Sequence, residues 1–189
     1  MDWMNTYGVL VVQVGVGIFL FLAASVFLAQ RWGAPWVTTP ARTVRRMLAL
    51  AELQPGEKLV DVGAGDGRIV VAAARKPGVE AVGIEIDPLR WLAANVWIRA
   101  AGVSKSAKVV YANFYDYDLR DAQVVTLYLT RETNQRVKQR LLGQLQGGAR
   151  VVSHAFPISG WTPKLIDEDV LIFVYEVGNC GDGVQTRFV

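Results

Sequence analysis

The chain has 189 residues, of which 52% are hydrophobic, and its formal net charge is only +3. This length holds one compact domain of about 150 residues besides an N-terminal segment. The only cysteine, Cys180, excludes an internal disulfide, and with a single histidine, His154, the composition does not favour a zinc site. We therefore expect no metal ligands in this chain.

A long apolar run occupies the N-terminal region. From Gly8 to Ala29 the sequence contains no charged residue, and a helix of this length is roughly 33 Å long, close to the thickness of a bilayer core. A cleaved signal peptide or a buried core helix would also be apolar. However, the run is longer than the apolar part of a signal peptide, only acidic Asp2 precedes it, and it has no polar stripe to face water. We therefore predict a retained transmembrane helix that contacts the lipid bilayer through residues 8–29.

The residues on either side of this run differ in charge. Arginines follow it at positions 31, 42, 45 and 46, whereas no lysine or arginine precedes it. Positive charge is typical of the cytoplasmic side of a membrane helix. Aromatic residues that favour the membrane interface stand on both sides, namely Trp3, Tyr7, Trp32 and Trp36. We expect a single-pass membrane protein whose N-terminus is outside and whose C-terminal domain faces the cytoplasm or the equivalent matrix side.

The rest of the chain alternates short β-rich runs with helical patterns. Residues 33–40 are expected to form an extended linker, and a helix over 43–53 ends at Pro55-Gly56. Strands are then predicted at 58–62, 81–86, 108–111, 124–129 and 150–153, and helices at 68–74, 88–101 and 131–145. This alternation indicates a doubly wound, mostly parallel α/β sheet with helices on both faces. Two further strands, 170–177 and 184–189, are expected at the C-terminus across a glycine-rich turn, with their direction left open.

A glycine-rich loop follows the first predicted strand. Residues 61–68 read Asp-Val-Gly-Ala-Gly-Asp-Gly-Arg, so glycines stand at 63, 65 and 67 immediately before a predicted helix. Without a Cβ, these positions let the backbone turn sharply and approach a ligand closely. A dinucleotide fingerprint, G-x-G-x-x-G, would place its third glycine at Arg68. The loop therefore favours a nucleoside ligand and disfavours a nicotinamide dinucleotide.

An acidic residue, Glu85, follows at the end of the next predicted strand. In a doubly wound sheet this position lies across the crevice from the glycine loop, where a carboxylate can accept hydrogen bonds from both hydroxyls of a ribose. Both S-adenosylmethionine and NAD carry such a ribose, so Glu85 alone does not distinguish them. The order of strand, loop, helix, strand and acid predicts a nucleoside-cofactor site.

The glycine loop resembles motif I of the seven-strand, class I S-adenosylmethionine-dependent methyltransferases. The combination of Gly-Asp-Gly-Arg with Gly83-Ile84-Glu85 narrows the resemblance. Further matches are Thr39-Pro40, Met47-Leu48, Tyr128-Leu129, the run 150–154 and Gly160-Trp161. Together they resemble the lysine methyltransferases that act on the ATP synthase c subunit and the adenine nucleotide translocase, and the archaeal broad-specificity enzymes. The resemblance covers about residues 38 to 177.

The resemblance implies a seven-strand Rossmann-like methyltransferase sheet, preceded by the predicted transmembrane helix, and S-adenosyl-L-methionine as the cofactor. It implies that the methionine end of the cofactor lies against Asp61, Gly63, Gly65 and Asp66. Glu85 would hold the ribose, and Asn113 with Phe114 would flank the adenine. The chain then divides into an anchor (1–32), a linker (33–42) and a methyltransferase domain (43–189).

The substrate side of the site departs from a common pattern. The Asn-Pro-Pro-Tyr motif of many amino-methylating enzymes is absent, and Tyr128-Leu129-Thr130 stands in its place. Tyr128 is the candidate for contacting the target amine, although an ordinary core tyrosine is the alternative. Thr130 could add a polar contact or cap a helix, and His154 could take a proton or be purely structural. These three residues are the catalytic candidates.

We therefore predict a membrane-anchored methyltransferase that modifies a lysine of a membrane or membrane-associated protein. The alternatives are methylation of a lipid-soluble small molecule, and a non-catalytic assembly factor that binds the cofactor. A nucleic-acid partner is not expected, because the catalytic region has no basic stripe with interleaved aromatic residues.

Overall fold

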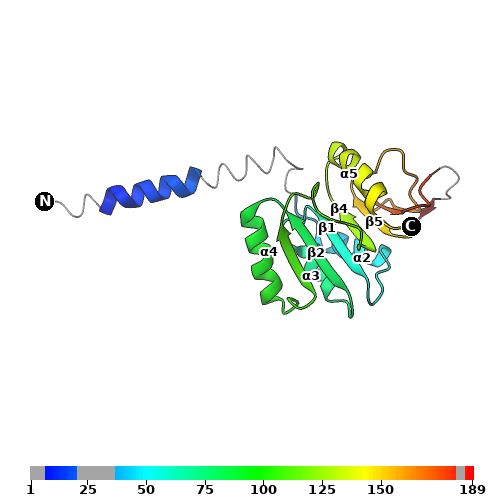
Figure 1. Cartoon of the computed structure of the whole chain (residues 1–189), viewed down its shortest axis with the longest axis horizontal. Helices are drawn as coiled ribbons and strands as arrows, with labels where there is room; N and C mark the ends of the chain where they lie inside the picture. Colours follow the sequence, from blue (N-terminus) through cyan, green and yellow to red (C-terminus); the bar gives the residue numbers. More distant parts are fainter. Residues whose placement is uncertain (1–6, 21–36, 182–185) are drawn as a thin grey trace.

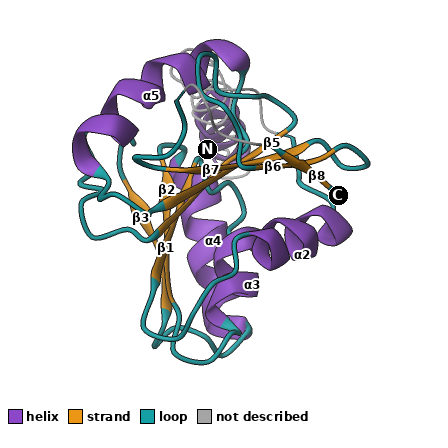
Figure 2. Cartoon of the chain, turned by 90° about the vertical axis from the view of Figure 1, so that its right-hand side faces the viewer, coloured by secondary structure: helices purple, strands orange, loops and turns teal. Residues whose placement is uncertain are grey.

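A computed structural model describes residues 7–20, 37–181 and 186–189 of the chain. An eight-stranded sheet forms the middle layer of the domain (Figure 1). Helices α2 to α4 lie on one side of the sheet and α5 lies on the other (Figure 2). The central strands β1 and β4 are buried over almost their whole length, as expected of strands covered on both faces.

The described elements follow the predicted alternation closely. The helices of the domain are α2 (Ala41–Leu50), α3 (Arg68–Ala74), α4 (Pro88–Ala100) and α5 (Arg131–Gln144). The strands are β1 (Lys58–Val62), β2 (Glu80–Glu85), β3 (Ala107–Tyr111), β4 (Val124–Leu127), β5 (Arg150–His154), β6 (Leu165–Asp167), β7 (Ile172–Glu176) and β8 (Arg187–Phe188). Most predicted boundaries fall within two residues of these bounds. Helix α2 is the clearest shift, since it begins directly after Pro40 and ends three residues before the predicted Leu53.

The strand order places the loops that follow β1, β2 and β4 side by side. The order is β3-β2-β1-β4-β5-β7-β6-β8, and the first five strands are mutually parallel. From β1 the chain adds β2 and β3 on one side, and it then returns to the other side of β1 to add β4 and β5, so the strand order reverses between β1 and β4. In such sheets, ligands bind in the crevice outside the carboxyl ends of the strands at this reversal. The predicted glycine loop and Tyr128 follow β1 and β4, and Glu85 is the last residue of β2, so all three lie at this crevice.

The C-terminal part of the sheet differs from the prediction. Strand β6 was not predicted, β7 runs antiparallel to both of its neighbours, and β8 pairs with β6 rather than with β7. The sheet therefore has eight strands instead of seven. The predicted strand 170–177 begins only at Ile172, because the Asp167 carboxylate accepts the Asp169 and Val170 N–H groups in a turn and Leu171 has a φ of 52°.

The predicted membrane span is only partly covered by the structure. Residues 7–20 are helical and their side chains are exposed, whereas residues 21–29 lie outside the described residues. Among the described residues, none of the helices combines the length and apolar character needed to cross a bilayer. The transmembrane helix therefore has no support from the described part of the chain.

Candidate active site

The glycine loop connects β1 to α3 and forms one wall of a cavity at the carboxyl ends of the strands. Gly63 and Gly67 both have φ values of 77°, a region that side chains disfavour. A Cβ at Gly67 would lie 3.1 Å from the Ala94 Cβ, so this glycine lets the loop pack against α4. The Gly63 and Ala64 N–H groups both donate to the Ile84 carbonyl oxygen, at 3.0 and 2.9 Å. The loop is thereby fastened to the end of β2.

Glu85 lies across this loop and is only 6% exposed. Its Oε2 accepts the Gly65 N–H at 2.8 Å, and its Oε1 accepts the Asp87 N–H at 2.9 Å. A carboxylate has about four lone-pair sites, so each oxygen can still accept one more hydrogen bond. Glu85 thus shapes the loop and keeps the acceptors that a ribose diol requires.

Asp61, the last residue but one of β1, is a buried carboxyl group on the cavity wall. The Thr126 hydroxyl of the neighbouring strand β4 donates to Asp61 Oδ1 at 2.7 Å. Burial raises the pKa of Asp61 to about 7, an effect that the Thr126 hydrogen bond opposes and the nearby charges of Glu85 and Asp66 increase. This carboxyl group is therefore sensitive to a positively charged ligand, which would favour its ionised form.

The raised pKa of Asp61 predicts a pH-dependent stability. The unfolded chain releases the Asp61 proton near pH 4, whereas the folded state keeps it up to about pH 7. The free energy of unfolding therefore falls as the pH rises between these two values. Asp61→Asn should remove this slope, making the unliganded variant more stable than the parent chain at pH 8 by on the order of 2–4 kcal/mol. Urea unfolding at pH 4, 6 and 8 measures the difference. Parallel pH profiles for the two proteins would contradict the buried, protonated carboxyl group.

Asp66 and Arg68 connect the loop to the segment before α2. Arg68 Nε donates to Asp66 Oδ1 at 2.9 Å, and Arg68 Nη1 donates to the Thr39 carbonyl oxygen at 2.6 Å. We call residues 37–39 the strap, because Val37, Thr38 and Thr39 line the cavity together with the glycine loop. Residues 33–42 were interpreted as a linker, and the strap was not expected to contribute to the site. No local signal in the sequence identifies a wall formed by a contact across 29 residues.

The two residues predicted to flank the adenine, Asn113 and Phe114, have different roles in the structure. Phe114 is 8% exposed and lines the cavity. Asn113 Oδ1 accepts the Tyr115 N–H at 3.1 Å, which shapes the turn that presents Phe114. Ile86, Ile69 and Arg90 also line the cavity and were missed. The position of Ile86, immediately after Glu85 at the end of a strand, is the signal that would have indicated it.

Tyr128 and His154 form an aromatic pair at the ends of the adjacent strands β4 and β5. Their ring centroids lie 4.2 Å apart at an interplanar angle of 46°, and Tyr128 lines the cavity. Burial lowers the pKa of His154, which favours the neutral imidazole. The His154 Nδ1 is buried and has no hydrogen-bond partner among the described residues. Thr130, the third candidate, accepts the Thr133 N–H at 3.3 Å as the N-cap of α5 and lies outside the cavity lining.

Comparisons with known proteins agree with this geometry. Residues 61–165 match the model of the ANTKMT methyltransferase domain. A protein-lysine N-methyltransferase of Saccharolobus islandicus (strain REY15A) is 43% identical over 131 residues, which are 69% of this chain and 81% of that protein. The adenine nucleotide translocase lysine N-methyltransferase of Mus musculus is 34% identical over 160 residues, which are 82% of this chain and 69% of that protein.

A solved structure is similar over most of the chain. An RNA methyltransferase from Salinibacter ruber, in complex with S-adenosyl-L-homocysteine, superposes with a TM-score of 0.73 and 36% identity, covering 79% of this chain and 99% of that one. The resemblance that the sequence motifs indicated is thus confirmed, and so is the cofactor that it implied. The chain belongs to the ANTKMT methyltransferase domain family and is an S-adenosylmethionine-dependent methyltransferase.

Proposed function

We propose that this enzyme methylates the ε-amino group of a lysine in a membrane or membrane-associated protein. The observation that carries the proposal is the cavity lined by Asp61, Glu85 and Tyr128, because it combines acceptors for a cationic nucleoside with an aromatic group in the same lining. The Saccharolobus islandicus and Mus musculus relatives are both protein-lysine N-methyltransferases, which supports lysine as the target.

The reaction requires alignment more than strong acid–base catalysis. S-adenosylmethionine, when bound, supplies an electrophilic methyl group to a neutral amine that approaches in line. The lysine ammonium must first lose its proton, and we assign its removal to the neutral imidazole of His154, which packs against the Tyr128 ring from outside the cavity lining. The Tyr128 ring limits where the amine can lie, and its hydroxyl can accept a hydrogen bond from the amine. Asp61 and Asp66 contribute negative charge on the cofactor side of the cavity.

Removal of the Tyr128 hydroxyl tests this arrangement. Tyr128→Phe should lower kcat by roughly 10- to 100-fold, because one hydrogen bond to a partly charged group contributes about 1.5–3 kcal/mol. The assay follows the transfer of radiolabelled methyl groups to membrane proteins. Tyr117→Phe is the matched control, since Tyr117 is a half-buried tyrosine outside the cavity lining. The site assignment would be wrong if Tyr128→Phe and Asp61→Ala both left methylation unchanged.

The role of Thr130 in the reaction needs a variant that preserves its cap. Glycine is nearly as good an N-cap as threonine and has no polar side chain. Thr130→Gly therefore keeps α5 while removing the proposed polar contact. Unchanged kcat in this variant would assign Thr130 to capping alone.

The same labelled methyl donor distinguishes the other functions. Label in the protein fraction supports lysine methylation, whereas label in extractable lipid indicates a lipid-soluble small molecule. No transfer at all would leave a cofactor-binding assembly factor. Because the Salinibacter ruber structure is described as an RNA methyltransferase, the RNA fraction is counted as well. We expect the label in protein, on lysine side chains identified by mass spectrometry.

We further propose that residues 8–29 anchor the enzyme in a membrane, with the domain on the cytoplasmic or equivalent matrix side. The uncharged run and the arginines that follow it support this topology. Protease added outside sealed, right-side-out vesicles should leave residues 37–189 intact and should digest them after the membrane is opened. Digestion of the domain from the outside of intact vesicles would reverse the topology. Release of the protein by carbonate would overturn the anchor.

A further inference from the structure

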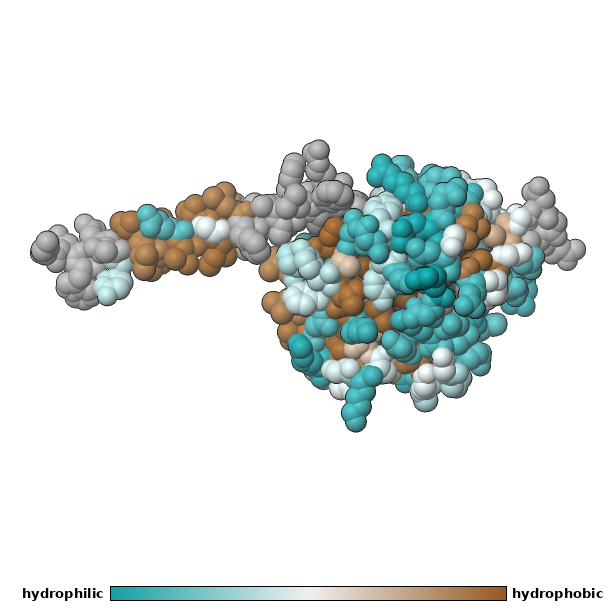
Figure 3. Space-filling model, in the orientation of Figure 1, coloured by the Kyte–Doolittle hydropathy of each residue, from teal (hydrophilic) through white to brown (hydrophobic). Residues whose placement is uncertain are grey.

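Helix α4 turns an apolar surface away from the domain. Ala94 and Ile98 pack into the core, and the Trp91 ring N–H donates to the Val109 carbonyl oxygen at 2.9 Å. On the outer side, Leu92 is 52% exposed and Val96 is 55% exposed. Hydrophobic (brown) side chains are visible over this part of the domain (Figure 3). We define the α4 face as the exposed residues Leu89, Leu92, Val96 and Trp97 together with Tyr111.

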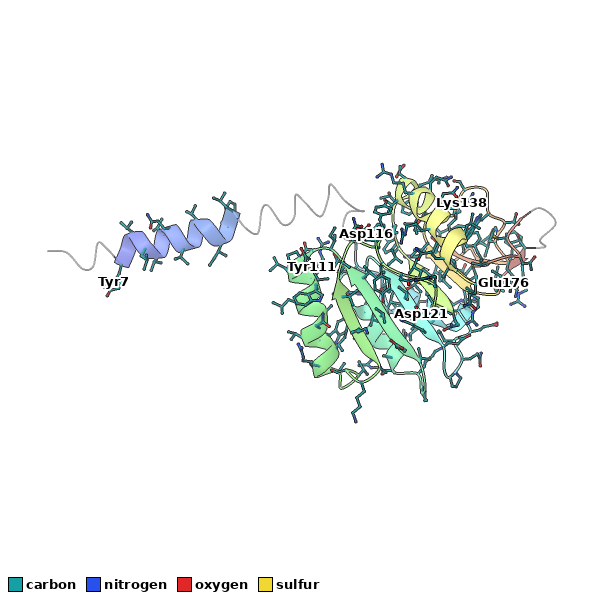
Figure 4. The ribbon with its side chains drawn as sticks, viewed as in Figure 1. Tyr7, Tyr111, Asp116, Asp121, Lys138 and Glu176 are labelled. Atoms are coloured by element: carbon teal, nitrogen blue, oxygen red, sulfur yellow. The ribbon has the colours of Figure 1, made fainter. Side chains whose placement is uncertain are left out.

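The helical residues of the α4 face form a second apolar stripe, separate from the one that packs into the core. Leu89, Leu92 and Val96 follow one another at intervals of three and four residues, so they share one side of the helix. Tyr111, at the end of β3, lies beside the first turn of α4 (Figure 4). Its ring centroid is 6.0 Å from that of Trp91. A helix that packs its inner side into the core normally presents charged or polar residues on its outer side. An apolar outer side of this extent is typical of an interaction surface.

Charges around the α4 face identify the kind of partner. The charged residues of α4 are Arg90, which lines the cavity with its Nε 4.0 Å from the carboxylate of the N-cap Asp87, and Arg99, which is exposed. Lys105 and Lys108, both exposed, follow between α4 and the end of β3. Leucine, valine, tryptophan and tyrosine flanked by cations are the composition with which an interfacial helix binds a membrane that contains anionic lipids.

The position of the α4 face agrees with a membrane surface. Val37 of the strap and Arg90 of α4 line the same cavity, so the chain leaves the domain beside the first turn of α4. Residues 30–36, which connect the strap to the proposed anchor, can span at most about 25 Å. Helix α4 itself is about 20 Å long. A domain tethered this closely can reach the bilayer surface with its α4 face.

We propose that the α4 face docks on the anionic lipid surface of the membrane to which residues 8–29 anchor the chain. This inference rests on the proposed anchoring. Docking would add a second contact to the tether, and it would fix the direction in which the cavity opens. A lysine close to the membrane surface could then reach Tyr128, whereas a lysine far from the bilayer could not.

A fluorescent probe on the α4 face tests this docking in the full chain. Val96→Cys is labelled with a polarity-sensitive dye in a Cys180→Ser background, and the protein is reconstituted into vesicles that contain phosphatidylglycerol and a lipid-attached quencher. Leu142→Cys is the matched control, because Leu142 is an exposed apolar residue (45%) on helix α5. We expect the probe at 96 to be quenched at least three-fold more strongly than the probe at 142. The difference should shrink in 1 M salt or in vesicles of phosphatidylcholine alone, because charge contributes to the contact.

The outcomes separate the docking from the anchor. Equal quenching at the two positions, in protein that floats with the vesicles, would overturn the docking and leave the anchor intact. Protein that does not float with the vesicles would overturn the anchor and the docking with it. Energy transfer between probes at 96 on different copies, without quenching by lipid, would show that the α4 face joins two copies and would also overturn the proposal.

Discussion

Glu85→Gln is expected to weaken the binding of S-adenosylhomocysteine by at least about 100-fold. The carboxylate offers one remaining acceptor site on each oxygen, and hydrogen bonds to a charged group contribute about 1.5–3 kcal/mol each. Glutamine has only one oxygen, and its NH₂ group would face either the Gly65 or the Asp87 N–H. Isothermal titration calorimetry of the purified protein measures the loss.

Two variants separate this effect from general damage to the fold. Glu80→Gln, at the exposed beginning of the same strand, should bind the ligand as the parent chain does. Glu85→Asp keeps the charge but shortens the side chain by one CH₂ group, so its affinity should lie between the two. If Glu85→Gln retained both the parent affinity and the parent thermal stability, Glu85 would not hold the ribose.

Gly83→Ala is expected to lower the free energy of unfolding by roughly 3 kcal/mol or more. A Cβ at this position would lie 2.6 Å from the Ala64 Cβ and 2.9 Å from methyl groups of Val70 and Val109. Gly83 belongs to the interior strand β2, and the atoms it would meet belong to the glycine loop, α3 and β3, so little can move aside. For a domain of this size the melting temperature should fall by roughly 6–12 °C in differential scanning calorimetry.

Gly143→Ala is the matched control for this change. Gly143 lies in helix α5, where an added Cβ would meet nothing within 4 Å. The same substitution there should stabilise the protein by about 0.5–1 kcal/mol, because glycine is a poor helix former. A similar destabilisation at both positions would mean that the close packing at Gly83 is not the cause.

The central part of the fold could be predicted because its signals are local. The sequence alone places β1 at 58–62 and α3 at 68–74, and both agree with the structure residue for residue. A buried apolar strand followed by glycines that need positive φ leaves few alternative structures for this segment of the chain. Glu85 follows from the same unit, since the next parallel strand must end beside the loop. The burial of Asp61 and its contact with Thr126 depend on which strand lies next to β1, which no local pattern specifies.

The rest of the site depends on contacts between distant residues. The strap lines the cavity through a hydrogen bond from Arg68 to a backbone carbonyl, and a carbonyl is present whatever side chain occupies position 39. Strand β6 has only three residues and is stabilised by pairing with β7, so its sequence carries almost no strand signal of its own. The roles of Tyr128, Thr130, His154 and the cofactor-binding residues stay predictions until variants are measured.

The strap also sets a limit for anyone who wishes to prepare a shortened form of the enzyme. Removing the apolar segment by starting the polypeptide at residue 41 would preserve every helix and strand of the domain, yet it would delete Val37, Thr38 and Thr39 from the cavity. Such a fragment would keep the elements of the fold but would lack part of the wall around the cofactor cavity. A useful truncation has to retain the residues from position 37 onward.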